Sequence, residues 1–175
     1  MVTCNGDADG SVTVTGSGGT VAGDYIYLRG NGQTTATATG LAAGSYTVTI
    51  TDDSGCQASA GPVTITEPTQ VLATMGSPSM VSCNGGSDGS VTVTGSGGTV
   101  AGDYTYLWNN GQITATATGL SAGSYTVTIT DDNGCQASAG PVTITEPTAV
   151  SASLGLPTMV TCNGDADGSV TVTGS

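Results

Sequence analysis

Three features of the sequence predict an all-β fold built from tandem β-sandwich repeats of 79 residues. The first is internal repetition, because Cys4, Cys83 and Cys162 are each separated by 79 residues. Residues 4–82 and 83–161 are identical at 64 of 79 positions by direct count. The second is strict alternation of apolar residues with threonine, and the third is a turn-forming sequence between the alternating runs.

The alternating runs follow one another in the same order in each repeat. In the first repeat they are 11–15, 24–28, 33–39, 45–51, 56–60 and 63–66. Turn residues that tolerate positive φ separate them, as in "GNG" at 30–32 and "DDSG" at 52–55. No window has the period of an amphipathic helix. Short strands with such turns predict an Ig-like or fibronectin-like Greek-key sandwich.

Domain boundaries follow from the phase of the repeat. Glu67-Pro68 and Glu146-Pro147 close the last strand, and 69–81 opens the next domain as a strand interrupted by glycine and proline. We therefore expect three parts, which are 1–67, a repeat domain lacking its first strand, 68–146, a complete β-sandwich, and 147–175, the opening strands of the next repeat. Such short, proline-marked junctions predict a stiff rod.

A second period of 158 residues is superimposed on the first. Residues 1–17 recur letter for letter at 159–175, so Met1 reads as a methionine of the repeat. We expect the chain to be a window on a longer array, with any signal peptide outside it.

One corner of the sandwich has a more specific pattern. The segments 40–51 and 119–130 place a leucine, a glycine and a tyrosine as in a tyrosine corner, where the hydroxyl bonds to upstream backbone. Tyr46 and Tyr125 are the predicted corner residues. The apolar partners expected in the core are Val12, Val14, Tyr27, Leu41, Val48, Ile50, Val63 and Ile65.

The composition excludes most enzyme classes. The chain has one arginine, no lysine and no histidine, so it lacks the usual bases, Schiff-base amines and imidazole metal ligands. Its formal net charge of −12 disfavours nucleic acid and anionic lipid. No apolar run is long enough for a membrane span. We expect neither catalysis nor membrane insertion in this segment.

The motifs of the repeat resemble a known family. "VSCNGGSDGSVTVTGSGG", "YTYLWNNGQ", "TATGLSAGSYTVTITDDNGCQA" and "VTITEP" follow one another as in the SprB-type repeat of Bacteroidota cell-surface adhesins. The resemblance implies a secreted, extracellular or cell-surface protein of tandem β-sandwiches linked to adhesion and gliding. Arg29 departs from the pattern, since tryptophan stands at the matching Trp108, and we expect that position to be half-exposed.

Five cysteines in such a chain predict disulfides. The spacing allows bridges within repeats, Cys4–Cys56 and Cys83–Cys135, or across junctions, Cys56–Cys83 and Cys135–Cys162; free buried thiols are the alternative. From the turn before 11–15 to the turn after 45–51 the chain crosses four expected strands, an even number. This parity returns the chain to the same end of the sandwich and favours the bridges within repeats, with the partner of Cys162 outside the window.

The acidic turns raise the question of calcium. "NGDADG" at 5–10 matches the opening of a calcium loop, but no glutamate stands at its twelfth position, so solvated turn residues are the competing interpretation. The candidate ligands are Asn5, Asp7, Asp9, Asp52, Asp53, Asp88, Asp131, Asp132, Asp165 and Asp167. If the bridge within repeats forms, Asp52 and Asp53 should lie at the same end as this loop.

The function predicted from the sequence is structural, a segment of a long extracellular filament or cell-surface stalk whose partners are further copies of the repeat. Two alternatives stay open. One is a module that binds surface polysaccharide through Tyr25, Tyr27, Tyr104, Tyr106 and Trp108. The other is a donor-strand pilus, in which 147–175 completes the next subunit, although the duplication of 1–17 at 159–175 argues against it.

Overall fold

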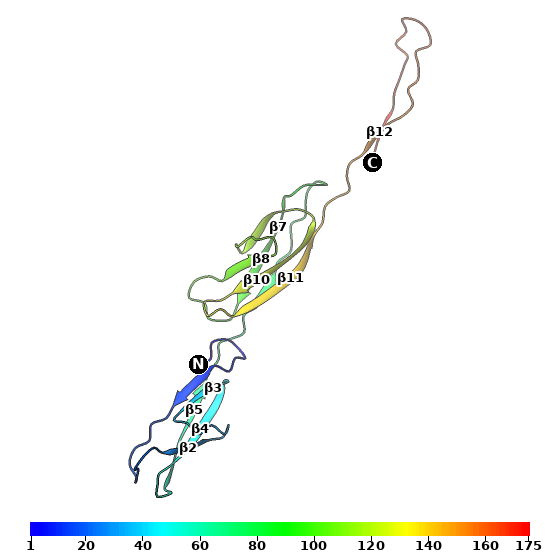
Figure 1. Ribbon diagram of the computed structural model, residues 1–175. Helices are drawn as coiled ribbons and strands as arrows, with labels where there is room; N and C mark the ends of the chain where they lie inside the picture. The colour runs from blue at the N-terminus through cyan, green and yellow to red at the C-terminus, as the bar shows by residue number, and fades with distance from the viewer.

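The computed structural model describes residues 1–175 and consists of β-strands joined by turns, with no helix (Figure 1). The first unit contains β1 (Gly10–Thr13), β2 (Ile26–Arg29), β3 (Thr37–Leu41), β4 (Gly44–Thr51) and β5 (Gln57–Ile65). The second contains β6 (Leu72–Met75), β7 (Gly89–Ser96), β8 (Thr105–Trp108), β9 (Thr116–Leu120), β10 (Gly123–Thr130) and β11 (Gln136–Ile144). A terminal hairpin contains β12 (Ala152–Leu154) and β13 (Val172–Gly174). The predicted all-β class is confirmed.

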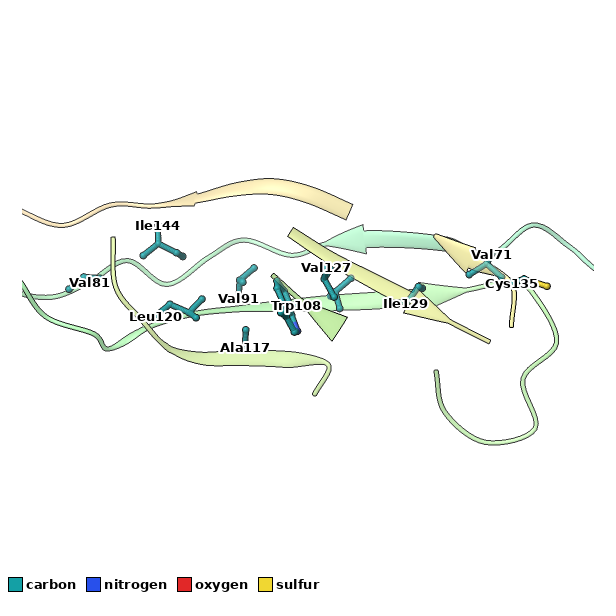
Figure 2. Packing of buried hydrophobic residues seen from close by; sticks show 11 residues of the cluster. Val71, Val81, Val91, Trp108, Ala117, Leu120, Val127, Ile129, Cys135 and Ile144 are labelled. Atoms are coloured by element: carbon teal, nitrogen blue, oxygen red, sulfur yellow. The ribbon is translucent and has the colours of Figure 1, made fainter. Parts of the chain in front are cut away.

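The second unit is a sandwich of two three-stranded antiparallel sheets, ordered β6-β7-β9 and β11-β10-β8. Eleven buried residues fill the space between them, with Trp108 near the middle and 1% exposed (Figure 2). The alternation of residues along each strand explains this core, because valine and isoleucine point inward while the intervening threonines face water.

The direction of the strands in this unit decides where its loops lie. β9 runs antiparallel to β7, and β8 runs antiparallel to β10. A two-residue turn joins β9 to β10, so those two strands also run in opposite directions. Consequently β8 and β9 run the same way, one in each sheet. Together they make one passage along the sandwich, and the chain from β7 to the end of β10 makes three passages.

The first unit repeats this topology with one strand fewer. Its sheets are β1-β3 and β2-β4-β5, and no strand occupies the place that β6 takes beside β7. Its buried apolar cluster has four residues. Leu41, Val48 and Ile65 are buried as expected, whereas Val12, Val14, Tyr27 and Ile50 are only half-buried and Val63 is exposed.

The last strand of each unit differs from the sequence prediction of two separate runs. β5 and β11 each continue through the glycine-proline pair, and the register of β5 on β4 shifts between Tyr46 and Val48. Proline is tolerated because β5 is an edge strand of its sheet, where the missing N–H group costs no ladder hydrogen bond.

Arg29 lies in the core, and its expected half-exposure is therefore wrong. It is 3% exposed, and its guanidinium donates to the carbonyl oxygens of Thr35 and Ala36, the latter at 2.8 Å from Nη2. At the matching place in the second unit, Trp108 Nε1 donates to the Thr114 carbonyl at 2.8 Å. Arginine can replace tryptophan here because both side chains present N–H donors to the equivalent loop, which joins β2 to β3 in the first unit and β8 to β9 in the second.

Candidate functional site: the junction between the two units

A disulfide between Cys4 and Cys135 joins the two units. Their Cα atoms are 5.6 Å apart although 131 residues separate them in sequence. Cys4 belongs to the loop before β1, and Cys135 follows β10, so the bond crosses the junction at which the units meet in Figure 1. Cys56, Cys83 and Cys162 are unpaired and exposed.

The favoured bridges within repeats are therefore wrong, and so are the alternative bridges across junctions. Parity failed because β8 and β9 run in the same direction, as do β2 and β3. Three passages, an odd number, place Cys83 and Cys135 at opposite ends of the second unit. By the same topology, Cys4 and Cys56 lie at opposite ends of the first unit.

The connection between the units is fixed by polar contacts as well. Asn5 Nδ2 donates to the Pro68 carbonyl at 3.1 Å, and the Gly6 amide donates to Glu67 Oε2 at 2.8 Å. Asn133 Nδ2 reaches across the junction to the Thr3 carbonyl at 3.2 Å. The sequence placed Glu67 only at the end of the last strand, although the recurrence of Thr-Glu-Pro at the end of each repeat is a signal that could have identified its role in the junction.

Asp131 positions the loop that carries Cys135. Its side chain is 6% exposed and accepts backbone N–H groups of Thr99, Asn133 and Cys135 at 2.8, 3.0 and 2.8 Å. These hydrogen bonds, that from Thr99 first, lower the pKa of the Asp131 carboxyl because they favour its charged form. Asp52 makes the matching contacts in the first unit, where the Thr20 amide is the main cause of its lowered pKa.

The acids of the other loops likewise accept hydrogen bonds locally. Asp9 accepts from the Thr3 hydroxyl and from the Thr3 amide, the latter at 2.9 Å, and these bonds lower its pKa. Asp88 and Asp167 do the same with Ser82 and Thr161. These carboxylates hold their own turns in shape.

The candidate calcium ligands do not gather into a cation site. The chain shows no group of three or more carboxylates or thiols that could hold a metal ion. The expectation that Asp52 and Asp53 share an end with the loop at 5–10 is wrong, because β1 and β4 run in the same direction and the two groups stand at opposite ends. The residues present do not fit a calcium site.

The aromatic side chains are engaged inside the units. Tyr46 and Tyr125 donate their hydroxyls to the carbonyls of Ala42 and Ser121 at 3.0 and 3.1 Å, the geometry of a tyrosine corner. Tyr104 donates to the Gly97 carbonyl at 2.6 Å, and Trp108 is buried. The predicted platform for sugar stacking therefore lacks Trp108.

Comparison with known protein families gives one match. The model described as SprB repeat matches residues 2–28 and 77–112, which are the equivalent parts of the two repeats. Neither the curated proteins nor the solved structures give a match. The structure contains no helix that could span a membrane. The chain thus carries SprB-type repeats, a kind of repeat that occurs in cell-surface proteins.

Proposed function

We propose that this chain is a load-bearing structural segment of an extracellular filament or cell-surface stalk. The observation that carries the proposal is the covalent closure of the junction by Cys4–Cys135. Hydrogen bonds from Asn5 and Gly6 to the Glu67-Pro68 connection support it, because they restrict the same junction from within the first unit.

The bridge changes how tension passes through the chain. Force applied to the two ends enters at Cys4, crosses the disulfide and leaves at Cys135. Residues 5–134, which include all of the strands β1 to β10, then lie outside the loaded path. A segment of this kind resists extension even if a sandwich opens, which is the property that a stalk requires.

The remaining chemistry of the chain fits a structural role better than a binding role. Trp108 is buried, Tyr104 and Tyr106 pack against the core of the second unit, and the Tyr25 hydroxyl donates to the Gly18 carbonyl, so these side chains do not form an open platform for polysaccharide. The net charge of −12 keeps copies of the acidic surface soluble and apart except where specific contacts overcome repulsion.

Single-molecule force spectroscopy on one chain, held at its two ends, tests the proposal. The oxidised chain should extend only by the residues outside the bridge. Reduction should release the chain between Cys4 and Cys135, a sequence separation of 131, which at about 3.3–3.6 Å per residue adds roughly 430–470 Å of contour length.

The variant Cys4→Ser should show the long extension without reductant, and Cys83→Ser, which removes an unpaired thiol, should behave like the unmodified chain. An oxidised chain that extends to the full contour length would contradict a load-bearing role for this bridge.

A further inference from the structure

We propose that the junction between the two units is a redox-sensitive rotational lock. While Cys4–Cys135 is closed, the two units keep one relative orientation. When a small dithiol reduces this bond, the second unit turns about the main-chain bonds of Thr69. The inference goes beyond the proposed load-bearing role, because it concerns the orientation of the two units when no force acts on them.

The connection between the units contains a single residue that is able to rotate. The Pro68 carbonyl accepts a hydrogen bond from Asn5 Nδ2 at 3.1 Å, so the peptide group that follows Pro68 is held by the first unit. The Thr69 carbonyl accepts the Gly98 amide at 2.9 Å, so the next peptide group is held by the second unit. Peptide groups are planar, and the φ and ψ bonds of Thr69 are therefore the only soft main-chain bonds between these two groups.

On the first-unit side, the loop that carries the bridge also holds the connection. The Gly6 amide donates to Glu67 Oε2 at 2.8 Å, beside the contact of Asn5 with Pro68. Cys4 directly precedes these two residues in the chain. The bridge and the connection are thus anchored to the first unit at the same place.

This anchor is a regular feature of the repeat and forms without a bridge. Asn84 Nδ2 donates to the Pro147 carbonyl at 3.1 Å, and the Gly85 amide donates to Glu146 Oε2 at 2.6 Å. Cys83, which precedes them, is unpaired in the structure. We therefore expect the anchor of the first unit to persist after reduction, so that Thr69 stays the hinge.

On the second-unit side, the chain packs closely as soon as it leaves Thr69. Val71 is 5% exposed, and a Cβ on Gly98 would lie 2.6 Å from one of its methyl carbons. A Cβ on Gly97 would clash with the carbonyl oxygen of Gln70. The chain can approach this closely because both positions are glycines, with φ of 76° and 67°.

Asp131 ties together the two points at which the second unit is attached. Its carboxylate accepts the amide of Thr99, next to Gly98, and the amide of Cys135, each at 2.8 Å. The side chain is 6% exposed, so water has little access to these hydrogen bonds. The connection and the bridge are thus fixed to the second unit through one buried carboxylate.

These contacts form a closed ring around the junction. The disulfide is one side of the ring, and the connection through Thr69 is the other. The loop from Cys4 to Asn5 closes the ring in the first unit, and Asp131 closes it in the second. Rotation about Thr69 would carry Cys135 away from Cys4, which the covalent bond does not allow. The closed bridge therefore holds the two units in one orientation.

Opening the bridge leaves one side-chain hydrogen bond across the junction that does not involve a bridge sulfur. Asn133 Nδ2 donates to the Thr3 carbonyl at 3.2 Å, and both residues are exposed. Water competes for such a bond, so its net contribution is small. Figure 1 shows the two units end to end, joined at this loop. The lock is therefore released together with the disulfide.

The release is an exchange reaction with the dithiol as reductant. One thiolate of the reagent attacks the sulfur of Cys4, which is half-buried whereas Cys135 is 8% exposed. This step forms a mixed disulfide and displaces the Cys135 thiolate, which takes up a proton. The second thiolate of the reagent then displaces Cys4 and closes the reagent to a cyclic disulfide. The bridge gains two electrons and two protons, and the dithiol loses them.

Residual dipolar couplings of the backbone amides, measured in a weakly aligned sample, test the lock. The chain carries Cys56→Ser, Cys83→Ser and Cys162→Ser, so that no other disulfide forms. The couplings of each unit are fitted to an alignment tensor of their own. The oxidised chain should give one tensor common to both units. Dithiothreitol should abolish this agreement, and reoxidation should restore it.

Asn133→Ser is the control for the remaining contact across the junction. It removes the hydrogen bond to Thr3, keeps the bridge and introduces the residue found at the matching Ser54. The oxidised variant should keep one common tensor.

Asn5→Ala opens the ring at a hydrogen bond and leaves the bridge closed. It should separate the two tensors in the oxidised chain, by less than reduction does. Asn84→Ala removes the matching contact outside the junction and should not separate them. This pair of variants decides the question if the first unit loses its dispersed amide spectrum on reduction.

Separate tensors in the oxidised parent would overturn the proposal, and so would a common tensor in a reduced chain whose units are both folded. If the reduced first unit unfolds, equal behaviour of Asn5→Ala and Asn84→Ala overturns it. The force measurement reads the length released when the bridge opens, whether or not the unloaded units rotate, so the two proposals can fail separately.

Discussion

Asp131 and Asp52 are small buried acids whose role is to shape the loop that presents a cysteine. Each carboxylate accepts several backbone N–H groups, including that of the cysteine four residues on. A buried carboxylate is stable only with such partners, and here the partners fix the direction of the cysteine side chain. Asp131 therefore positions one half of the bridge, and Asp52 positions the unpaired Cys56, without reacting themselves.

Asp131→Asn should lower the melting temperature at neutral pH, because the amide is a weaker acceptor for the three N–H groups. It should also reduce the loss of stability in acid. The folded-state pKa of Asp131 lies below its ordinary value of 3.8, so its stabilisation is present above 3.8 and is lost as the pH falls through the lower folded value. Thermal unfolding followed across this range measures both effects.

Asp103→Asn is the control, because Asp103 is an exposed acid of the same loop region. If the two variants unfold alike at every pH, the positioning role of Asp131 is wrong.

The missing counterpart of β6 accounts for the difference between the two units. In the second unit Val71, Ala73 and Met75 cover the edge of the core, and the buried apolar cluster has eleven residues against four in the first. One short strand has this effect because it seals the gap between two sheets, where each inward side chain contacts both of them.

Val71→Ala should destabilise the second unit by about 2 kcal/mol, which corresponds to the loss of two buried carbon groups. Leu72→Ala removes a larger side chain from the same strand but at a position that is 52% exposed, and it should have a smaller effect. Chemical denaturation of the two variants beside the parent makes the comparison. Equal destabilisation would mean that the edge of this core is not sealed by Val71.

At the level of the whole chain, the position of the disulfide decides how force passes through the molecule. Cys4–Cys135 spans the greater part of both units. Force on the two ends of the chain passes through this bond and bypasses the strands β1 to β10.

Cys4→Ser should lower the free energy of unfolding of the chain by roughly 5 kcal/mol at most, the chain-entropy value for a loop of this length. Cys162→Ser leaves the Cys4–Cys135 bridge intact and should leave stability unchanged. Denaturant unfolding under non-reducing conditions compares the two. Equal stability would show that the bridge does not constrain the unfolded chain.

The sequence by itself determined the local and periodic properties of this protein. The 79-residue repeat and the valine-threonine alternation predicted the all-β fold and most of the strands, because strand period and turn chemistry are local. The SprB-type motifs predicted the family. The absence of lysine and histidine limits the chemistry that the side chains can perform, whatever their arrangement in space.

Only the tertiary structure decided how the cysteines pair and which side chains are buried. Counting strands could not reveal that β8 and β9 run in the same direction in different sheets, since direction depends on which strands pair over long distances. Burial of Arg29 depended on how the loop between β2 and β3 folds back over it, which brings the carbonyl groups of Thr35 and Ala36 to its guanidinium. Exposure of Val63 depended on a strand that the first unit lacks. Strand direction and cysteine pairing arise from contacts between segments distant in sequence, so the pattern of one repeat does not contain them.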